Sequence, residues 1–249
     1  MKVRVYLVVF LQFLGYSCGV LSFKISDVFP VCKKNDDQCL TAAIEKALHY
    51  LCENGLPELK LPKLDPIAIP EISIGTKGSA ADISQKYIDV KLHGFKKASV
   101  SNAHLDWEKK KLTFTVFAPQ LDQVSSYDFN GRILIFPIRG QGKAVLSQSN
   151  VTVYHTIQFD TVKKQDKDYF KVVSYVISTN PSKTSFKVDN LFNGNEALSE
   201  RVHEVVNDNW KVLWDEAKAD VDLTYAKVYE TFAQKLFGKL PISDLVIQA

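Results

Sequence analysis

The stretch that decides the fold is residues 191–247, LFNGNEALSERVHEVVNDNWKVLWDEAKADVDLTYAKVYETFAQKLFGKLPISDLVI. It begins with a predicted turn and ends with a predicted stop. Between these, the sequence predicts one helical run of about 40 residues, longer than a typical globular helix. It lacks the strict heptads that favour a coiled coil. Its apolar residues recur at helical spacing: Leu198, Val202, Val206, Trp210, Leu213, Val221, Tyr225, Val228, Phe232 and Leu236.

A helix this long and this apolar needs a large partner surface, and the strand-like segments before it can supply one. In 111–118, apolar and polar residues alternate, which is typical of an antiparallel sheet with one wet face. Strands followed by a helix indicate an α+β fold. Such a sheet can bury its apolar face against another sheet or by wrapping a helix, and the long helix favours wrapping. The predicted strands are Ile83–Phe95, Ala98–Asp106, Lys111–Ala118, Tyr127–Ile138, Lys143–Phe159 and Tyr169–Ser178.

A shorter helix is predicted near the start of the chain, at 38–53. Asp36 and Asp37 are candidates for its N-cap, and Gly55 is its expected stop. The next segment, LPELKLPKLDPIAIPEISI at 56–74, contains four prolines. These exclude a helix and favour an extended connector. The stripe that the helix is expected to bury is Leu40, Ile44, Ala47, Leu48 and Leu51.

The first residues have the pattern of a secretory signal peptide. Lys2 and Arg4 precede a short apolar run, and small and polar residues follow it. We therefore expect a signal peptide at 1–19 and a single domain at 20–249. The apolar run is too short to span a bilayer. We expect a secreted, extracellular protein without stable membrane insertion.

Charge and composition narrow the possible partners. The chain has 31 Lys and Arg and 28 Asp and Glu, and two of the basic residues lie in the expected signal peptide. This near-neutral balance argues against nucleic acid as a partner. Asn150 begins the Asn-Val-Thr sequon, which predicts a surface turn if it is glycosylated.

The cysteines also carry information about the compartment. In an oxidising compartment, Cys32 and Cys39 are expected to form a disulfide that closes a small loop. Cys52 is expected to be a buried free thiol on the first helix. His49 lies three residues before it, so a catalytic thiol remains a minor alternative.

Motifs for catalysis are not found in the sequence. There is no G-x-S-x-G, H-E-x-x-H or phosphate loop. The five histidines are scattered without the spacing of metal ligands. We expect a protein that is not an enzyme, with no metal and no cofactor.

Three blocks of sequence, in order, resemble the takeout and juvenile hormone-binding protein family of insects, and the resemblance covers about residues 27–247. The first block joins the cysteine pair to the proline-rich segment, and the second contains spaced glycines. The blocks are CKKNDDQCL at 32–40 with ENGLPELKLPKLDP at 53–66, YDFNGRILIFPIRGQGK at 127–143, and LFNGN at 191–195 with DNW at 208–210 and KLPISDL at 239–245.

The resemblance implies a long helix wrapped by a strongly curved antiparallel sheet, as in the tubular lipid-binding superfamily, with an apolar tunnel between them. It implies a monomeric carrier of a small hydrophobic ligand, such as a terpenoid, a juvenile hormone-like compound, a fatty acid or a quinone-like lipid. The hormone carriers have a second disulfide, but this chain has no cysteine after Cys52. It therefore resembles the takeout branch. A secreted signalling protein with a structural lipid is the alternative, and an esterase is a weaker one.

Tyr127 is the expected polar anchor for a ligand oxygen, because its strand neighbours are apolar and its ring ends in a hydroxyl. The alternative is that backbone groups satisfy this hydroxyl. The other residues expected to line the ligand site, for which a filled core is equally compatible with the periodicity, are Phe129, Ile133, Ile135, Phe114, Val116, Val153, Phe159, Tyr175, Val202 and Trp210.

Overall fold

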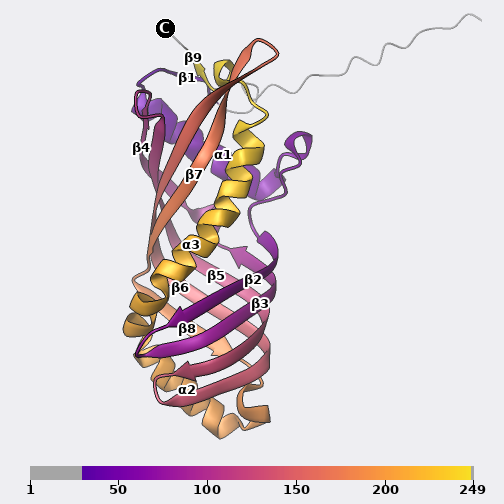
Figure 1. The fold of residues 1–249 in the computed structure, drawn as a ribbon, viewed down its shortest axis with the longest axis vertical. Helices are drawn as coiled ribbons and strands as arrows, with labels where there is room; N and C mark the ends of the chain where they lie inside the picture. The colour runs from indigo at the N-terminus through magenta and orange to yellow at the C-terminus, as the bar shows by residue number, and fades with distance from the viewer. Residues whose placement is uncertain (1–29, 248–249) are drawn as a thin grey trace, which may run out of the picture.

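A long helix lies in the concave face of a strongly curved antiparallel sheet in the computed structural model, which describes residues 30–247 (Figure 1). The sheet has seven strands in the order β2-β3-β5-β6-β7, with β4 on β5 and β8 on β6. The strands are β2 (Ile67–Lys77), β3 (Ala81–His93), β4 (Ser99–Asp106), β5 (Lys111–Ile133), β6 (Phe136–Lys164), β7 (Lys167–Asn180) and β8 (Lys183–Val188). The predicted α+β architecture is confirmed.

The helices lie before and after the sheet in the chain. They are α1 (Asp37–Asn54), α2 (Glu196–Asp208) and α3 (Trp210–Phe237), with short 3-10 turns at Pro57–Leu59, Phe95–Lys97, Leu191–Gly194 and Ile242–Asp244. A small parallel ladder pairs β1 (Cys32–Lys33) with β9 (Val246–Ile247). The two ends of the described chain are thus joined at one end of the molecule (Figure 1).

Two very long strands, β5 with 23 residues and β6 with 29, run through the whole length of the molecule. The prediction of separate strands at 111–118 and 127–138 was therefore wrong. Pro119 lies inside β5. It lies opposite Asn150, between the pairs Ala118–Val151 and Gln120–Ser149, and Asn150 has a φ of 46°. Proline is tolerated where the ladder is irregular, so the chain continues through this point.

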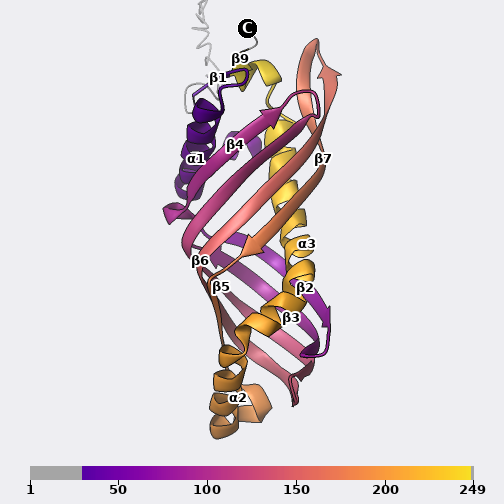
Figure 2. The same cartoon turned by 90° about the vertical axis from the view of Figure 1, so that its left-hand side faces the viewer.

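This irregularity divides the sheet into two parts (Figure 2). On one side, β5 pairs with β4 and β6 pairs with β7; we call this part, with α1 and the C-terminal part of α3, the upper half. On the other side, β5 pairs with β3 and β6 pairs with β8; this part, with β2, α2 and the start of α3, is the lower half.

The predicted run of about 40 helical residues is two helices, because the chain turns out of helical geometry at Asn209. The side-chain nitrogen of Asn209 donates to the carbonyl of Val205 at 2.8 Å. Asn and Asp are poor helix formers because their side chains compete for backbone groups, and residues 207–209 are Asn-Asp-Asn. The helix ends before Gly238, as expected.

The first helix follows its predicted caps. Asp36 accepts a hydrogen bond from the amide of Cys39 at 3.0 Å, and Gly55 closes the helix with a φ of 67°. The connector prediction was wrong in its second part, where β2 begins. Pro70 fits there because β2 is an edge strand whose register passes over this residue, from Ile69–Val90 to Glu71–Ile88. Strand β8 was also missed.

α1 covers the free edge of β4 with a row of polar side chains spaced four residues apart. Thr41 accepts from the amide of Ala103 at 3.2 Å, and Glu45 accepts from the amide of Val100 at 2.7 Å. His49 donates to the carbonyl of Ala98 at 2.7 Å. Unpaired strand edges can pair with strands of other chains. This row of side chains occupies backbone groups at the edge of β4 that would otherwise be open to such pairing.

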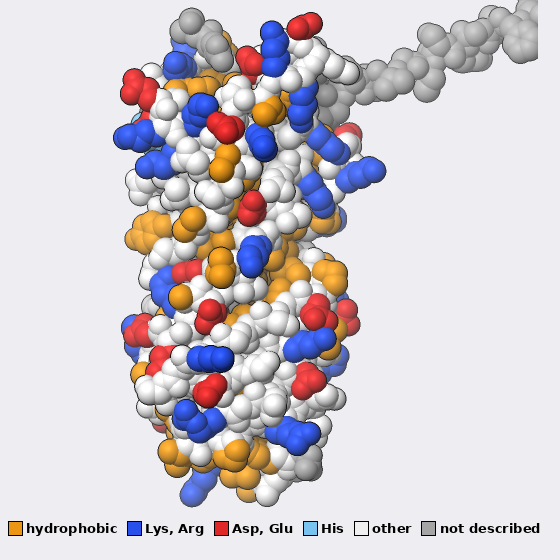
Figure 3. Space-filling model, in the orientation of Figure 1, with side chains coloured by type: hydrophobic (Ala, Val, Ile, Leu, Met, Phe, Trp, Pro, Cys, Tyr) orange, Lys and Arg blue, Asp and Glu red, His pale blue; other side chains and the backbone are white. Residues whose placement is uncertain are grey.

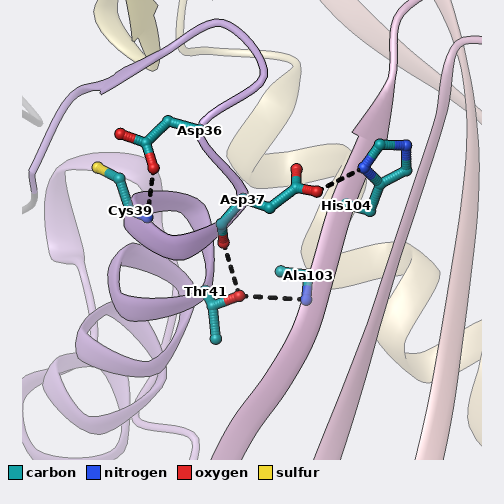
Figure 4. A network of polar contacts seen from close by, with 6 residues as sticks. All are labelled: Asp36, Asp37, Cys39, Thr41, Ala103 and His104. Carbon is teal, nitrogen blue, oxygen red and sulfur yellow. Dashed lines mark hydrogen bonds and ion pairs between the residues drawn. The ribbon is translucent and has the colours of Figure 1, made fainter.

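The same row continues to the N-terminus of α1, where Figure 4 shows how the helix is tied to β4. The hydroxyl of Thr41 also donates to the carbonyl of Asp37 at 2.8 Å. The carboxylate of Asp37 is 2.8 Å from the Nδ1 atom of His104. The amide of Ala103 is free to reach Thr41 because the β4–β5 register shifts between Ser101 and His104.

Candidate ligand-binding site

Three cavities lie in a row along α3, between this helix and the sheet. We call them the lower cavity (≈ 140 Å³), the middle cavity (≈ 210 Å³) and the upper cavity (≈ 130 Å³). Tyr229 lines both the lower and the middle cavity. Leu112 and Phe237 line both the middle and the upper cavity. Each cavity therefore shares lining residues with the next.

The middle and upper cavities are lined almost entirely by apolar side chains. The inner face of α1 contributes Ile44, Ala47 and Leu51 to both. Of the predicted buried stripe, only Leu51 is fully buried. The others remain partly accessible because they face empty space.

The lower cavity has a different lining. It combines apolar residues from β3, β5, β6, β8 and the two C-terminal helices with neutral polar side chains. None of its lining residues, within the described chain, is Lys, Arg, Asp or Glu. Its polar members are Thr76, Gln85, Gln123, Gln148, Thr179, Thr184, His203 and three tyrosine or tryptophan side chains, Tyr87, Tyr225 and Trp214, with Tyr229 at the shared wall.

The wall between the lower and middle cavities is aromatic and uncharged. His155 stacks on Phe114, with ring centroids 4.6 Å apart, and its Nδ1 atom is 3.0 Å from the hydroxyl of Tyr175. Tyr229 packs on the edge of the same imidazole at 5.6 Å. Burial lowers the pKa of His155 to about 3, because a charged imidazole would lose its hydration there. Burial also raises the pKa of Tyr175 and of Tyr229.

Most of the residues predicted from the sequence face one of the three cavities. Phe129, Ile133, Val153 and Val202 line the lower cavity. Phe114, Val116 and Tyr175 line the middle cavity, and Phe159 lines the upper cavity. The side chains that line the cavities thus come from the same alternating apolar positions that would otherwise fill a core.

Two predicted residues, besides Tyr127, lie outside the three linings. Ile135 is 82% exposed in the tight connection between β5 and β6. Trp210, at the first position of α3, is only partly buried and belongs to none of the three linings; Trp214, one turn later, lines the lower cavity. Periodicity identifies a face of a strand or helix, but it does not show where that face leaves the core.

Tyr127 is fully buried, and its hydroxyl donates to the carbonyl of Asp189 at 2.6 Å. Burial, followed by the negative charge of Asp189, raises the pKa of Tyr127 to about 12. Its ring lies against the strand at Gly140 and Gly142, where a Cβ atom would be 3.1 Å from the tyrosine. The backbone thus uses this hydroxyl, and the side chain is outside the lining of the lower cavity.

Sequence reasoning missed Gln123, which lies on the inner face of β5 between two predicted strands. Its side-chain oxygen accepts a hydrogen bond from the hydroxyl of Tyr225 on α3. The residue is 6% exposed and lines the lower cavity. The only signal for it was Leu121, Gln123, Ser125 and Tyr127 at alternating positions, which would have extended the strand.

The disulfide between Cys32 and Cys39 is present in the structure, as predicted. Cys52 is a free, fully buried cysteine, also as predicted, and burial raises the pKa of its thiol to about 12. The imidazole of His49 donates to the carbonyl of Ala98, directly before β4. Asn150 is exposed but lies within β6, where the ladder is irregular, and not in a turn.

Residues 30–247 contain no cluster of His, Cys, Asp or Glu side chains that could hold a metal ion. No helix in the same range is long and apolar enough to cross a membrane. The predicted signal peptide at 1–19 lies outside the described residues.

Figure 3 shows apolar side chains gathered across the middle of one face, where the upper and lower halves meet, and again at the lower end. The protein is therefore elongated, with a helix in the concave face of a curved sheet and a row of mainly apolar cavities between them. The chain belongs to the haemolymph juvenile hormone binding protein (JHBP) family, whose model matches residues 7–247.

Known proteins of two kinds are similar to the chain. The circadian clock-controlled protein daywake of Drosophila melanogaster is 27% identical over 86% of this chain and 85% of its own length. Daywake of Drosophila yakuba is 25% identical over the same shares. The crystal structure of Epiphyas postvittana Takeout 1 superposes with a TM-score of 0.79 at 26% identity, covering 87% of this chain and 98% of that one.

Proposed function

We propose that this protein is a secreted, monomeric, non-enzymatic carrier that holds one small hydrophobic ligand in the cavities along α3. The observation that carries this proposal is the row of three cavities with shared walls, each lined mainly by apolar side chains. A family named for binding juvenile hormone in haemolymph supports it. Apolar transfer would drive binding, at about 25 cal/mol per Å² of buried apolar surface.

The cavity row explains why an elongated guest suits this protein. Tyr229 separates the lower and middle cavities, and Leu112 and Phe237 separate the middle and upper ones. These are side chains, which can change rotamer without breaking a strand or helix. A long terpenoid or acyl chain would occupy two or three cavities, whereas a compact ligand would occupy one.

The test is mass spectrometry of an organic-solvent extract of the protein purified from its native secretion. A lipid or terpenoid recovered at one molecule per protein would support the carrier function and identify the ligand class. An empty extract, combined with no uptake of isoprenoids or fatty acids by the purified protein, would mean that the cavities hold no apolar ligand. The carrier function would then be wrong.

A second candidate function is suggested by an exposed apolar strip on the outer face of the upper half. Phe117 is 39% exposed, Tyr154 is 53% exposed and Val176 is 58% exposed. The strand register makes them diagonal neighbours on β5, β6 and β7. Exposed apolar strips mark contact surfaces, so a receptor contact would lie here. Tyr154→Glu should abolish receptor binding and leave ligand uptake unchanged if this function holds.

A further inference from the structure

The lower cavity contains a buried hydrogen-bond donor without a partner. The side-chain nitrogen of Gln123 has no hydrogen-bond partner among the described residues, although only 6% of the surface of this residue is exposed. Leaving such a group unpaired costs about 1–3 kcal/mol. Native proteins seldom retain such a group without a reason, and this one lines a cavity.

Tyr225 determines which end of the amide is left free. Its hydroxyl donates to the Oε1 atom of Gln123 and so occupies the acceptor end of the side chain. Tyr225 is partly buried, and desolvation raises the pKa of its hydroxyl, which stays neutral and remains a donor. The N–H groups of Gln123 are left without a partner among the described residues, and the residue lines the cavity.

Gln148 of the same cavity differs, because its Nε2 atom donates to the hydroxyl of Thr184 at 3.4 Å. The Oε1 atom of Gln85 also accepts from a tyrosine hydroxyl, that of Tyr87 at 2.7 Å, but Gln85 is only partly buried. Thr76 also has an unpartnered buried hydroxyl, but it lies near the β2–β3 turn. Gln123 lies near the irregularity at Pro119, where the lower cavity approaches the middle one.

The charge of the lining restricts the ligand further. No Lys, Arg, Asp or Glu side chain lines the described cavity, and burial lowers the pKa of its only histidine, His203. An ionised carboxylate placed here would lose its hydration without meeting an opposite charge. A neutral oxygen would lose much less and would gain the hydrogen bond of Gln123.

We propose that Gln123, oriented by Tyr225, is the polar anchor of the lower cavity and selects apolar ligands that carry a neutral acceptor oxygen, as in a ketone or an ester. Hydrocarbons without this oxygen leave the donor unpaired, and free carboxylic acids place an unpaired charge in the cavity. This inference rests on the proposed carrier function and assigns the specificity of that function to one side chain.

The test compares three ligands with thirteen carbons each: tridecane, 2-tridecanone and tridecanoic acid. Each competes with the neutral fluorescent probe N-phenyl-1-naphthylamine for the purified protein at pH 7.5. In Gln123→Met, the affinity for 2-tridecanone relative to tridecane should fall roughly fivefold to tenfold, the value of one lost hydrogen bond. The matched control, Gln120→Met, should keep the wild-type ratio because Gln120 is exposed, lies outside the three linings and already donates its side-chain nitrogen to Asp122 at 2.9 Å.

A spectroscopic measurement separates anchoring from a general change of packing. The carbonyl stretch of bound 2-tridecanone should lie at lower frequency in the wild type and return to its non-bonded frequency in Gln123→Met. If Gln123→Met does not fold because Tyr225 loses its acceptor, the double variant with Tyr225→Phe replaces both partners by apolar groups of similar shape. It should show the same loss of preference.

The outcomes distinguish the two proposals. If neither the probe nor any of the three compounds binds to the protein, the carrier function is wrong. If they bind but the ketone preference is the same in wild type and Gln123→Met, the carrier function stands and the anchor is wrong. Tridecanoic acid that binds as tightly as the ketone at pH 7.5 would also contradict the selection of neutral oxygens.

Discussion

The upper and lower halves protect a free sheet edge with the same kind of contact. In the upper half, Thr41 and Glu45 of α1 accept hydrogen bonds from the backbone of β4. In the lower half, Asn207 of α2 bonds to both the amide and the carbonyl of Phe186 in β8, at 2.7 Å and 3.1 Å. His203 accepts from the amide of Val188 at 3.0 Å. In both halves the side chains are four residues apart on a helix, so they face one strand.

The halves differ in how the helix is held and in what it encloses. A disulfide closes the chain just before α1, whereas α2 continues into α3 through Asn209. The upper and middle cavities are nearly all apolar, while the lower one contains glutamines and threonines. In the proposed carrier, the upper half would provide apolar volume and the lower half would provide recognition.

Among the differences between the two halves, removal of the disulfide of the upper half should have the largest effect on stability. The double variant Cys32→Ser/Cys39→Ser should lose about 2–3 kcal/mol of unfolding free energy, since the bond closes a short loop. Urea unfolding measures this loss. Amide exchange at Val100 and Ala103 should accelerate more than exchange in β8, because α1 covers β4 alone. An unchanged unfolding midpoint would mean that the disulfide has no structural role.

Removing the contact of the lower helix should have the next largest effect. Asn207→Ala leaves the amide and the carbonyl of Phe186 without partners, which should cost about 2 kcal/mol at about 1 kcal/mol per hydrogen bond. Asp208→Ala, an exposed neighbour, should stay within about 0.5 kcal/mol of the wild type. Equal urea midpoints for the two variants would show that α2 does not protect the edge of β8.

The wall between the cavities should make the protein sensitive to acid. The pKa of His155 is about 3 in the folded protein and about 6.5 when unfolded, so below pH 6.5 the unfolded chain binds an extra proton. The unfolding free energy should then fall by up to about 1.4 kcal/mol per pH unit between pH 6.5 and pH 3. In His155→Asn, which keeps an acceptor and does not titrate, this slope should be smaller by one proton. Parallel stability curves from pH 7 to pH 4 would contradict this assignment.

The smallest expected effect distinguishes two roles of Tyr127. Tyr127→Phe should cost about 1 kcal/mol of stability, because the hydroxyl donates to the carbonyl of Asp189. It should leave the affinity for 2-tridecanone unchanged, in contrast to Gln123→Met. Chemical denaturation and probe displacement measure the two quantities on the same samples. A loss of ketone affinity without a loss of stability would restore Tyr127 as the ligand anchor.

Much of the fold could be predicted from the sequence because local signals carry it. Asp36 and Gly55 mark the ends of α1, and alternation marks the inner face of every predicted strand. The signals that failed were also local. Pro70 suggested a connector, and no signal joined 111–118 to 127–138. Pro70 and Pro119 both lie where the ladder does not need their missing amide.

The candidate site was only partly predictable, and the two tyrosines Tyr127 and Tyr225 show why. Tyr127 and Tyr225 both stand out from the sequence as polar-tipped aromatics on apolar faces. The structure directs the first hydroxyl to the backbone at Asp189 and the second to Gln123, 102 residues away. No spacing along the chain contains this information, because hydrogen bonds between distant elements are set by how those elements pack.

The sequence by itself determined the order of elements, the cysteine pair, the apolar faces and the resemblance to a family. These depend on neighbouring residues, whose periodicity and capping chemistry are readable in one dimension. Only the tertiary structure decided that the apolar faces leave three cavities, that Ile135 lies outside them and that Gln123 lines one with a free donor. Cavity volume and unpaired polar groups depend on how side chains from separate elements pack together, and these packing contacts form only in the folded chain.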